Sequence, residues 1–527
     1  MKRKLAHVPK TMLAILTSGF LLFMVACGDA PNSPAVPAVS GTANPLVAQY
    51  TVLSSCPGKA MVEFGPDTTY GRSTPWYPVA GDNGATTILV AGMRASSTYH
   101  MHAVVQCATG TTTTADTTFT TGALPSLPFP ALTVSRPNPS LSSTENPGIE
   151  MITIPVAGTP AFFTDRDGNP IWYYDVGQGS FPFTFKPLPD GNIVISITAP
   201  SGSLLREIDL AGNVVRELKI SDLQQQAAAA GYDFVPSGYH HDVLPLANGH
   251  VIVLLNTFQN FTDLPGYTGT ITVEGDAIID LDPNWHVAWA WNGFDHLDVN
   301  RHLQPTLDSN NTLDWTHSNA LVYSPSDGSV ILSMRHQSWV IKINYDNGTG
   351  DGTILWKLGY QGDFALTQNG VPTDDPSLWF SFQHFPVLLS QNGSQSEFAV
   401  WDNGDNRVLD PSGAECVNPA LGTPPCYSRA TIYNVDESAK VADLEWSDLQ
   451  TAYGLWGGSI NRLQNGNVEF DLNAPVLPPV TGLASQVLEV TQSDSPQTVW
   501  QMNIPMPYFA YRAYRVPSLY TDVTWQY

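Results

Sequence analysis

The chain has 527 residues, with 47 Asp and Glu against 23 Lys and Arg, so its formal net charge is −24. Such an acidic chain repels phosphate backbones and has few cations for a basic patch, which excludes nucleic acid as a partner. A hydrophobic share of 43% excludes disorder, and 42 Gly with 42 Pro favour many short strands joined by turns.

Residues 1–26 are typical of a bacterial export signal. Four Lys and Arg residues precede an apolar run, residues 12–26, which is shorter than the roughly 20 residues of a spanning helix. The run ends in Met-Val-Ala-Cys, which resembles the lipobox of lipoproteins; an ordinary signal peptide cleaved nearby is the alternative. We therefore predict lipid on Cys27 and a periplasmic protein anchored to a membrane.

The next segments predict a tether and a small domain. Residues 27–44 are small, polar and rich in Pro, which indicates a flexible tether. Residues 45–122 alternate apolar and polar side chains between turn clusters, and they resemble a fibronectin III or immunoglobulin-like β-sandwich. We expect residues 123–147 to be a linker.

Four cysteines remain after Cys27, and in an oxidising compartment they predict two disulfides. Four cysteines allow three pairings. Position in the chain favours Cys56 with Cys107 and Cys416 with Cys426.

From residue 148 onward two kinds of hairpin alternate along the chain. Inner hairpins such as LPLANGHVIVL carry a Pro, Gly or Asn turn, and six outer hairpins such as IIDLDPNWHVAWAW tend to end near Trp. Pairs of hairpins make four-stranded sheets, so residues 148–527 predict a six-bladed β-propeller in an all-β chain. The first outer hairpin lacks an inner partner, and we expect strands near 511–520 to supply it and close the ring.

Aligned on their turns, three inner hairpins place a histidine at one shared position. YHHDVLPLANG, DWTHSNALVYSPSDG and QHFPVLLSQNG superpose His240, His317 and His384. Because inner strands line the channel of a propeller, three imidazoles are expected to converge there, with Asn319 two residues beyond His317. His241 should then face the opposite side of its strand.

Arg335 lies in SMRHQSWVIKI, which we interpret as the second strand of the blade that begins with His317, with His336 facing away. A charge in an apolar strand calls for an anionic partner. Three imidazoles suit Zn or Cu, whereas imidazoles with an Arg also suit an anion such as a sulfuryl group, toward which a neutral imidazole is a nucleophile.

These motifs, with LGYQGDF and the QHFP segment before DNGDNR, resemble the bacterial arylsulfate sulfotransferases over residues 148–520. The resemblance implies transfer of a sulfuryl group from a phenolic sulfate ester to a phenol, without PAPS, by a ping-pong route through a sulfohistidine. It implies that His384 is the nucleophile and that His240, His317 and Arg335 are further catalytic residues. It also implies that Asn319 binds the substrate as a hydrogen-bond donor.

With that resemblance, we expect no metal and no cofactor, and partners limited to phenolic donors and acceptors and the membrane; a homodimer is possible. Trp379, Phe380 and Phe382 would either stack on substrate rings at the channel mouth or pack in the core. The alternatives are a metal- or quinone-dependent propeller oxidoreductase and a non-catalytic, lipid-anchored binding propeller.

Overall fold

The computed structural model describes residues 38–141, 148–303, 306–450, 452–473 and 483–525. The described chain is all-β, as predicted, with one α-helix, α1 (Ile220–Ala229), and a few short 3₁₀ turns. Among these residues no helix is both long and apolar enough to cross a membrane. Cys27 and the predicted signal lie outside the described residues.

Strands β1 to β9 form two antiparallel sheets. One contains β1 (Ala38–Gly41), β2 (Ala48–Ser54) and β6 (Gly84–Val90); the other contains β3 (Gly58–Gly65), β4 (Arg72–Ser73), β5 (Tyr77–Val79), β7 (Thr98–Cys107), β8 (Gly110–Thr113) and β9 (Thr117–Thr120). Alternate side chains of β2 and β7 are buried, as expected for strands with one face on a core. The disulfide Cys56–Cys107 lies beside this core and confirms one predicted pairing.

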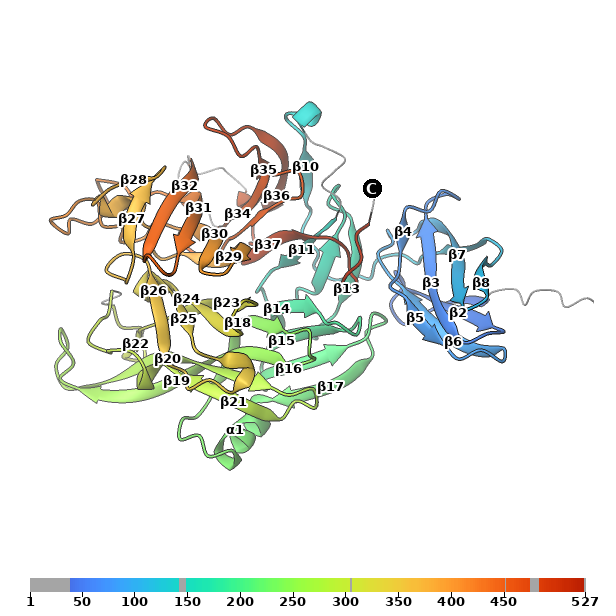
Figure 1. Ribbon diagram of the computed structural model, residues 1–527, viewed down its shortest axis with the longest axis horizontal. Coiled ribbons are helices and arrows are strands. Elements are labelled where there is room, and N and C mark those ends of the chain that lie inside the picture. Colours follow the sequence, from blue (N-terminus) through green and yellow to red (C-terminus); the bar gives the residue numbers. More distant parts are fainter. Residues whose placement is uncertain (1–37, 142–147, 304–305, 451, 474–482, 526–527) are drawn as a thin grey trace, which may run out of the picture. The chain divides into compact units, whose positions relative to one another are not determined.

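After β10 (Thr133–Ser135), the chain builds six antiparallel sheets of four main strands each (Figure 1). The first three sheets are β11 (Ile149–Thr153), β12 (Ala161–Thr164), β13 (Pro170–Tyr174) with β37 (Arg512–Val516); β14 (Phe181–Pro187), β15 (Ile193–Ala199), β16 (Gly202–Ile208), β17 (Val214–Lys219); and β18 (Gly238–Pro245), β19 (Val251–Thr262), β20 (Thr270–Leu281), β21 (Val287–Asn292).

The other three sheets are β23 (Ser318–Ser324), β24 (Ser329–Met334), β25 (Trp339–Ile343), β26 (Ile354–Leu358); β29 (His384–Asn392), β30 (Gln395–Asp402), β31 (Arg429–Asp436), β32 (Val441–Leu449); and β33 (Ser459–Arg462), β34 (Val468–Asn473), β35 (Leu483–Val490), β36 (Thr498–Pro505). Edge strands β10, β22 (Thr312–Asp314), β27 (Ala365–Gln368) and β28 (Val371–Pro372) extend three of the six.

The first strands of the six sheets, together with β37, form a ring of contacts. Strand β14 contacts β18, β18 contacts β23, β23 contacts β29, β29 contacts β33, and β33 contacts β37; β11, which pairs with β37, contacts β14 and closes the ring. Strand β37 pairs with β11 from Ile149↔Val516 to Thr153↔Arg512, which confirms that a late strand completes the first hairpin. Side chains at the starts of these strands are therefore brought together in the middle of the ring.

A buried ion-pair cluster stabilises the pairing of β37 with β11. Arg515 on β37 donates from Nε to Glu150 of β11 and from Nη1 to Glu489 of β35, both at 2.8 Å, and all three side chains are almost fully buried. The ring is thus held across its first and last sheets by charge as well as by the β11–β37 ladder.

Arg515→Met is expected to lower the free energy of unfolding by about 3–5 kcal/mol, because the buried Glu150 loses its cation and Glu489 keeps the more distant Arg166, at 3.7 Å. Urea unfolding followed by circular dichroism measures the loss. The matched control is Arg136→Met, which breaks an exposed pair with Asp167 and should cost about 1 kcal/mol or less. Equal losses for the two variants would contradict a structural role for the buried pair.

Candidate active site

A cavity of about 690 Å³ is lined by residues from the ring of first strands and from adjoining loops. Its walls carry four imidazoles, one guanidinium and two carboxylates, from His241, His317, His336, His384, Arg335, Asp314 and Asp405. Phe183, Phe382, Tyr453, Trp456 and Tyr511 add aromatic surface. Of the predicted catalytic residues, His317, His384 and Arg335 therefore meet in one cavity.

His240 does not line this cavity, and its neighbour His241 does. Strict alternation along the strand fails because β18 has a register shift between Tyr239 and Val243, where His241 takes a left-handed φ of 52°. Strand β23 is also irregular, between Ser318 and Ala320, and His317 just before it has φ 47°. Such bulges turn a side chain toward a different face of the sheet, so the expected orientation of His241 was wrong.

His384 is buried and oriented by Asn403. The Asn403 amide NH₂ donates to the carbonyls of Gly454 at 2.7 Å and Gly457 at 3.1 Å, so its Oδ1 faces His384 Nδ1 at 2.7 Å. His384 must therefore carry its proton on Nδ1. Its Nε2 is unprotonated, and its lone pair accepts a long hydrogen bond from the Gly457 backbone nitrogen at 3.3 Å.

The environment of His384 also disfavours a second proton. Burial, followed by the nearby charge of Arg335, holds the pKa of His384 well below the usual value of 6.5. A neutral imidazole with a fixed tautomer and an unprotonated Nε2 is the form that acts as a nucleophile.

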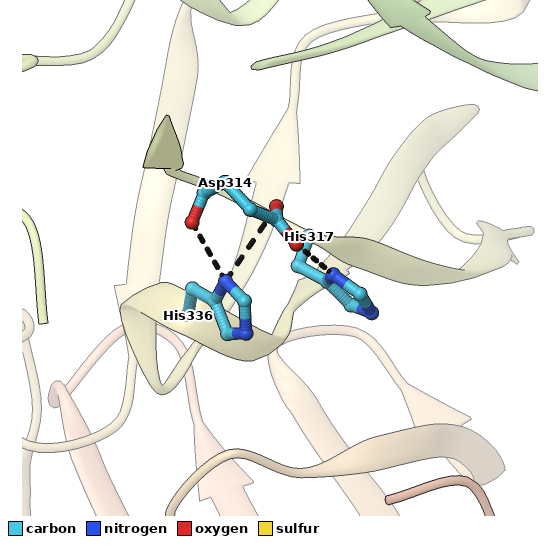
Figure 2. Close-up of side chains that lie close together, drawn as sticks. All are labelled: Asp314, His317 and His336. Atoms are coloured by element: carbon cyan, nitrogen blue, oxygen red, sulfur yellow. Dashed lines mark hydrogen bonds and ion pairs between the residues drawn. The ribbon is translucent and has the colours of Figure 1, made fainter. Parts of the chain in front are cut away.

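His317 and His336 both hydrogen-bond to Asp314, as Figure 2 shows. His317 Nδ1 lies 2.5 Å from the Asp314 carboxylate, whereas His336 Nδ1 donates to the Asp314 carbonyl at 2.8 Å. Burial alone would raise the pKa of Asp314, but His317 and the hydrogen bonds from both imidazoles lower it overall. The charged Asp314 carboxylate accepts the hydrogen bond from His317 Nδ1 and thereby orients this imidazole in the cavity.

The same three residues bring potential metal-ligating atoms within 4.8 Å of one another. However, both nitrogens of His336 are engaged, because Nδ1 donates to a carbonyl and Nε2 accepts from Arg335. A guanidinium next to the cluster also disfavours a cation. The geometry fits a hydrogen-bond network better than a metal centre, and burial lowers the pKa of His336 to about 4, which keeps it neutral.

Arg335 lies in the 3₁₀ turn Arg335–Gln337 after β24, not on the strand, which corrects the sequence-based placement. Its Nη2 donates to Asp405 at 2.9 Å and to the Leu455 carbonyl at 3.0 Å. Asp405 also accepts a hydrogen bond from Tyr453. Burial raises the pKa of Asp405 to about 7, with Arg335 opposing the shift. The predicted anionic partner of Arg335 is thus a titratable carboxylate.

His240 contacts His241 but does not line the cavity. His240 Nε2 lies 3.2 Å from the buried carboxylate of Asp276, and the two Nδ1 atoms of His240 and His241 lie 2.6 Å apart. Burial, followed by the neighbouring His240, lowers the pKa of His241 well below its usual value.

Asn319 does not line the cavity either, which corrects its expected position. Its side chain is fully buried, and Nδ2 donates to the Gln383 carbonyl at 2.8 Å, so this amide braces the strand before His384. Of the three aromatic residues expected at the channel mouth, Phe382 lines the cavity, whereas Trp379 and Phe380 pack in a core cluster.

The cavity contains residues that sequence reasoning missed: His241, His336, Asp314, Asp405 and Tyr511. The spacing of Asp314 three residues before His317 was a usable signal, because an acid so close to a histidine often orients it. Tyr511 comes from the closing segment, and its ring centroid lies 5.3 Å from His241 and 5.9 Å from His384. No local motif marks it. The disulfide Cys416–Cys426, which confirms the second predicted pairing, lies at the same cavity.

Comparison with known proteins identifies the family of the chain. The family model of the arylsulfotransferases (ASST) matches residues 153–515. The chain therefore belongs to the arylsulfotransferase family.

Two curated relatives carry the name arylsulfate sulfotransferase AssT. The protein of Escherichia coli O6:H1 is 22% identical over 348 residues, and that of Lelliottia amnigena is 21% identical over 344. Each alignment covers 54% of this chain and 52% of the relative, so the match spans about half the length of either relative. Among solved structures, a DUF4221 family member from Bacteroides vulgatus aligns over 74% of this chain and 98% of its own, at 9% identity and a TM-score of 0.31, too remote to define the fold.

Proposed function

We propose that the protein is an arylsulfate sulfotransferase, which moves a sulfuryl group from a phenolic sulfate ester to a phenolic acceptor by a ping-pong route through a sulfohistidine. The observation that carries this proposal is His384, a buried neutral imidazole close to Arg335. Asn403 fixes its proton on Nδ1, and the Nε2 lone pair accepts only a long hydrogen bond from the Gly457 N–H, at 3.3 Å. Family membership supports the same chemistry.

In the first half-reaction His384 Nε2 forms a bond to sulfur while the bond from sulfur to the phenolic oxygen breaks. His317, held by Asp314, gives its Nε2 proton to the departing phenolate. The sulfated imidazole keeps its Nδ1 proton, which remains hydrogen-bonded to Asn403. Arg335 and the Gly457 N–H would hold the sulfuryl oxygens, whose charge persists through a loose transition state.

In the second half-reaction the acceptor phenol gives its proton to the now neutral His317, and its oxygen attacks sulfur. The bond from sulfur to His384 breaks, and both imidazoles regain their starting forms. The aromatic walls, including Phe183 and Tyr511, would hold successive phenol rings in one place.

The fold proposal is that the six four-stranded sheets are the blades of a β-propeller over residues 148–527. Residues 45–122, preceded by β1, would then be a fibronectin III or immunoglobulin-like sandwich. The segment 123–147, which was expected to be a linker, contributes β10 to the last of the six sheets, where it pairs with β36. The successive contacts between first strands and the β11–β37 pairing support this reading.

We also propose that residues 1–26 direct export and that lipid on Cys27 anchors the protein to a membrane facing the periplasm. The predicted tether of residues 27–44 is too long, because Ala38–Gly41 form strand β1, which pairs with β2. Cys27→Ser is expected to move the protein from the membrane fraction to the soluble periplasmic fraction. Fractionation of cells expressing each form, followed by immunoblotting, checks this; an unchanged distribution would count against the lipid anchor.

The decisive experiment is to incubate purified protein with 4-nitrophenyl sulfate, with and without phenol, in the absence of PAPS. Acceptor-dependent release of nitrophenolate, with parallel double-reciprocal lines, is expected, and a chelator should leave the rate unchanged. An absence of acceptor-dependent release would reject the proposal. Loss of the rate on chelation would favour a metal-dependent enzyme instead.

The pKa of Asp405 predicts a pH dependence of donor binding. Below pH 7 Asp405 is mainly protonated, and Arg335 is available to the sulfate ester; above pH 7 the carboxylate is charged and competes for Arg335. The KM for 4-nitrophenyl sulfate should therefore rise between pH 6 and 8, by several-fold, and Asp405→Asn should flatten the rise. Steady-state kinetics across this range tests it, and an unchanged pH profile in Asp405→Asn would exclude the mechanism. Asp402, Arg407 and Tyr453 also surround the side chain of residue 405, and they are unchanged between the wild-type protein and Asp405→Asn.

A further inference from the structure

A second cavity, of about 170 Å³, adjoins the first, and Asn406 lines both. Three aromatic side chains, those of Tyr360, Trp379 and Phe380, form part of its wall. An apolar cavity of about 150 Å³ is known to hold a benzene ring. One substituted aromatic ring is therefore the size of ligand that this cavity accommodates.

Arg301 lines this cavity, and no acidic side chain among the described residues pairs with its guanidinium. Its guanidinium lies 3.6 Å from the ring centroid of Trp339, and Nη1 donates to the backbone and side-chain oxygens of Gln337 at 2.8 and 2.7 Å. Within the described part of the chain, Arg301 forms no ion pair, and its Nε and Nη2 have no hydrogen-bond acceptor. Burial without an acidic partner lowers the pKa of Arg301 to about 10, which leaves it charged at neutral pH.

A second guanidinium, that of Arg407, lines the same cavity. Its Nη atoms are engaged, with Asp402 at 2.8 Å and the Trp379 carbonyl at 2.8 Å among their acceptors, but its buried Nε has no acceptor among the described residues. Glu415 is the acidic residue at this cavity; it is exposed and makes no ion pair with Arg301 in the described structure. In a chain of net charge −24, such a cavity favours an anion.

We propose that this second cavity binds a small aromatic anion, a single ring bearing a carboxylate or sulfate. The ring packs against the aromatic wall, and the anionic group accepts hydrogen bonds from Arg301, whose planar guanidinium suits two oxygens. This site is separate from His384 and goes beyond the proposed transfer reaction, because binding here needs no sulfuryl donor.

Isothermal titration calorimetry of the full chain with benzoate tests the proposal for an aromatic carboxylate. A parallel titration with phenyl sulfate tests it for an aromatic sulfate. Benzoate should bind at least tenfold more tightly than acetate, which lacks the ring, and than phenol, which lacks the charge. Arg301→Gln should weaken benzoate at least tenfold, whereas Glu415→Gln should keep or improve the affinity. Arg335→Gln, which changes the main cavity, should leave benzoate binding intact.

Unchanged benzoate affinity in Arg301→Gln, or its loss in Arg335→Gln alone, would overturn the proposal by assigning the ligand elsewhere. A crystal soaked with 4-iodobenzoate provides a readout that needs no variant. An anomalous iodine peak beside Tyr360 and Trp379 supports the site, and a peak beside His384 or no peak overturns it. Benzoate binding with no sulfuryl transfer would reject the proposed enzyme but not this site.

Discussion

His384→Ala is expected to abolish transfer from 4-nitrophenyl sulfate to phenol, with a fall in kcat of roughly 10⁴-fold or more, as when an enzyme loses its nucleophile. The reason is geometric. His384 Nε2 carries the lone pair, because Nδ1 is committed to Asn403 Oδ1 at 2.7 Å; attack on sulfur would replace the long hydrogen bond that this lone pair accepts from the Gly457 N–H at 3.3 Å. Without that nitrogen no sulfated intermediate forms, so the initial burst of nitrophenolate in the absence of phenol should also disappear.

The matched control is His286→Ala, which removes a side chain that is 71% exposed and should leave kcat unchanged. Asn403→Leu separates orientation from chemistry, since it keeps the nucleophile and removes the group that fixes its tautomer. We expect kcat to fall roughly 10- to 100-fold with little change in KM. Near-normal kcat in His384→Ala, with the burst retained, would refute the assignment of the nucleophile.

Arg335→Gln is expected to lower kcat/KM roughly 10²- to 10³-fold, the usual effect of removing a preorganised donor for transition-state charge. Arg335 is the guanidinium of the main cavity, and its side chain is only 12% exposed, so water would not replace it efficiently. Because the sulfuryl group is anionic in the ground state too, both KM and kcat should change. Initial rates over a range of donor concentrations separate the two.

Arg335→Lys is the informative companion, since it keeps the charge but loses the planar fork of donors, and an intermediate loss is expected. The exposed Arg136→Gln should have wild-type kinetics. If Arg335→Gln and Arg136→Gln had the same kcat/KM, Arg335 would have no part in binding the sulfuryl group.

Much of the fold could be read from repetition. The alternating hairpins predicted a series of four-stranded sheets, and the unpaired first hairpin predicted a late strand, which is β37. Period-2 alternation also indicated the N-terminal strands. These predictions rest on hydrogen-bond pairing and burial along regular strands, where local sequence is informative.

Prediction from sequence failed where the backbone leaves that regular pattern. The left-handed conformation of His241 brings its side chain, in place of that of His240, into the cavity. A prediction that assumes strict alternation of side chains along a strand cannot detect this change. Arg335 is in a 3₁₀ turn for which its apolar surroundings gave no sign. Asp405 and Tyr511 reach the cavity from segments distant in sequence, so only three-dimensional packing reveals them.

The closure of the ring also constrains how the chain is made. Glu150 and Arg515 are 365 residues apart, which corresponds to roughly 20–70 s of synthesis at about 5–20 residues per second. During that interval one edge of β11 is unpaired, and Glu150, which is buried in the folded protein, lacks its partner Arg515. An unpaired strand edge is a template for pairing with other chains, so the newly made chain is more prone to aggregate until β37 pairs with β11.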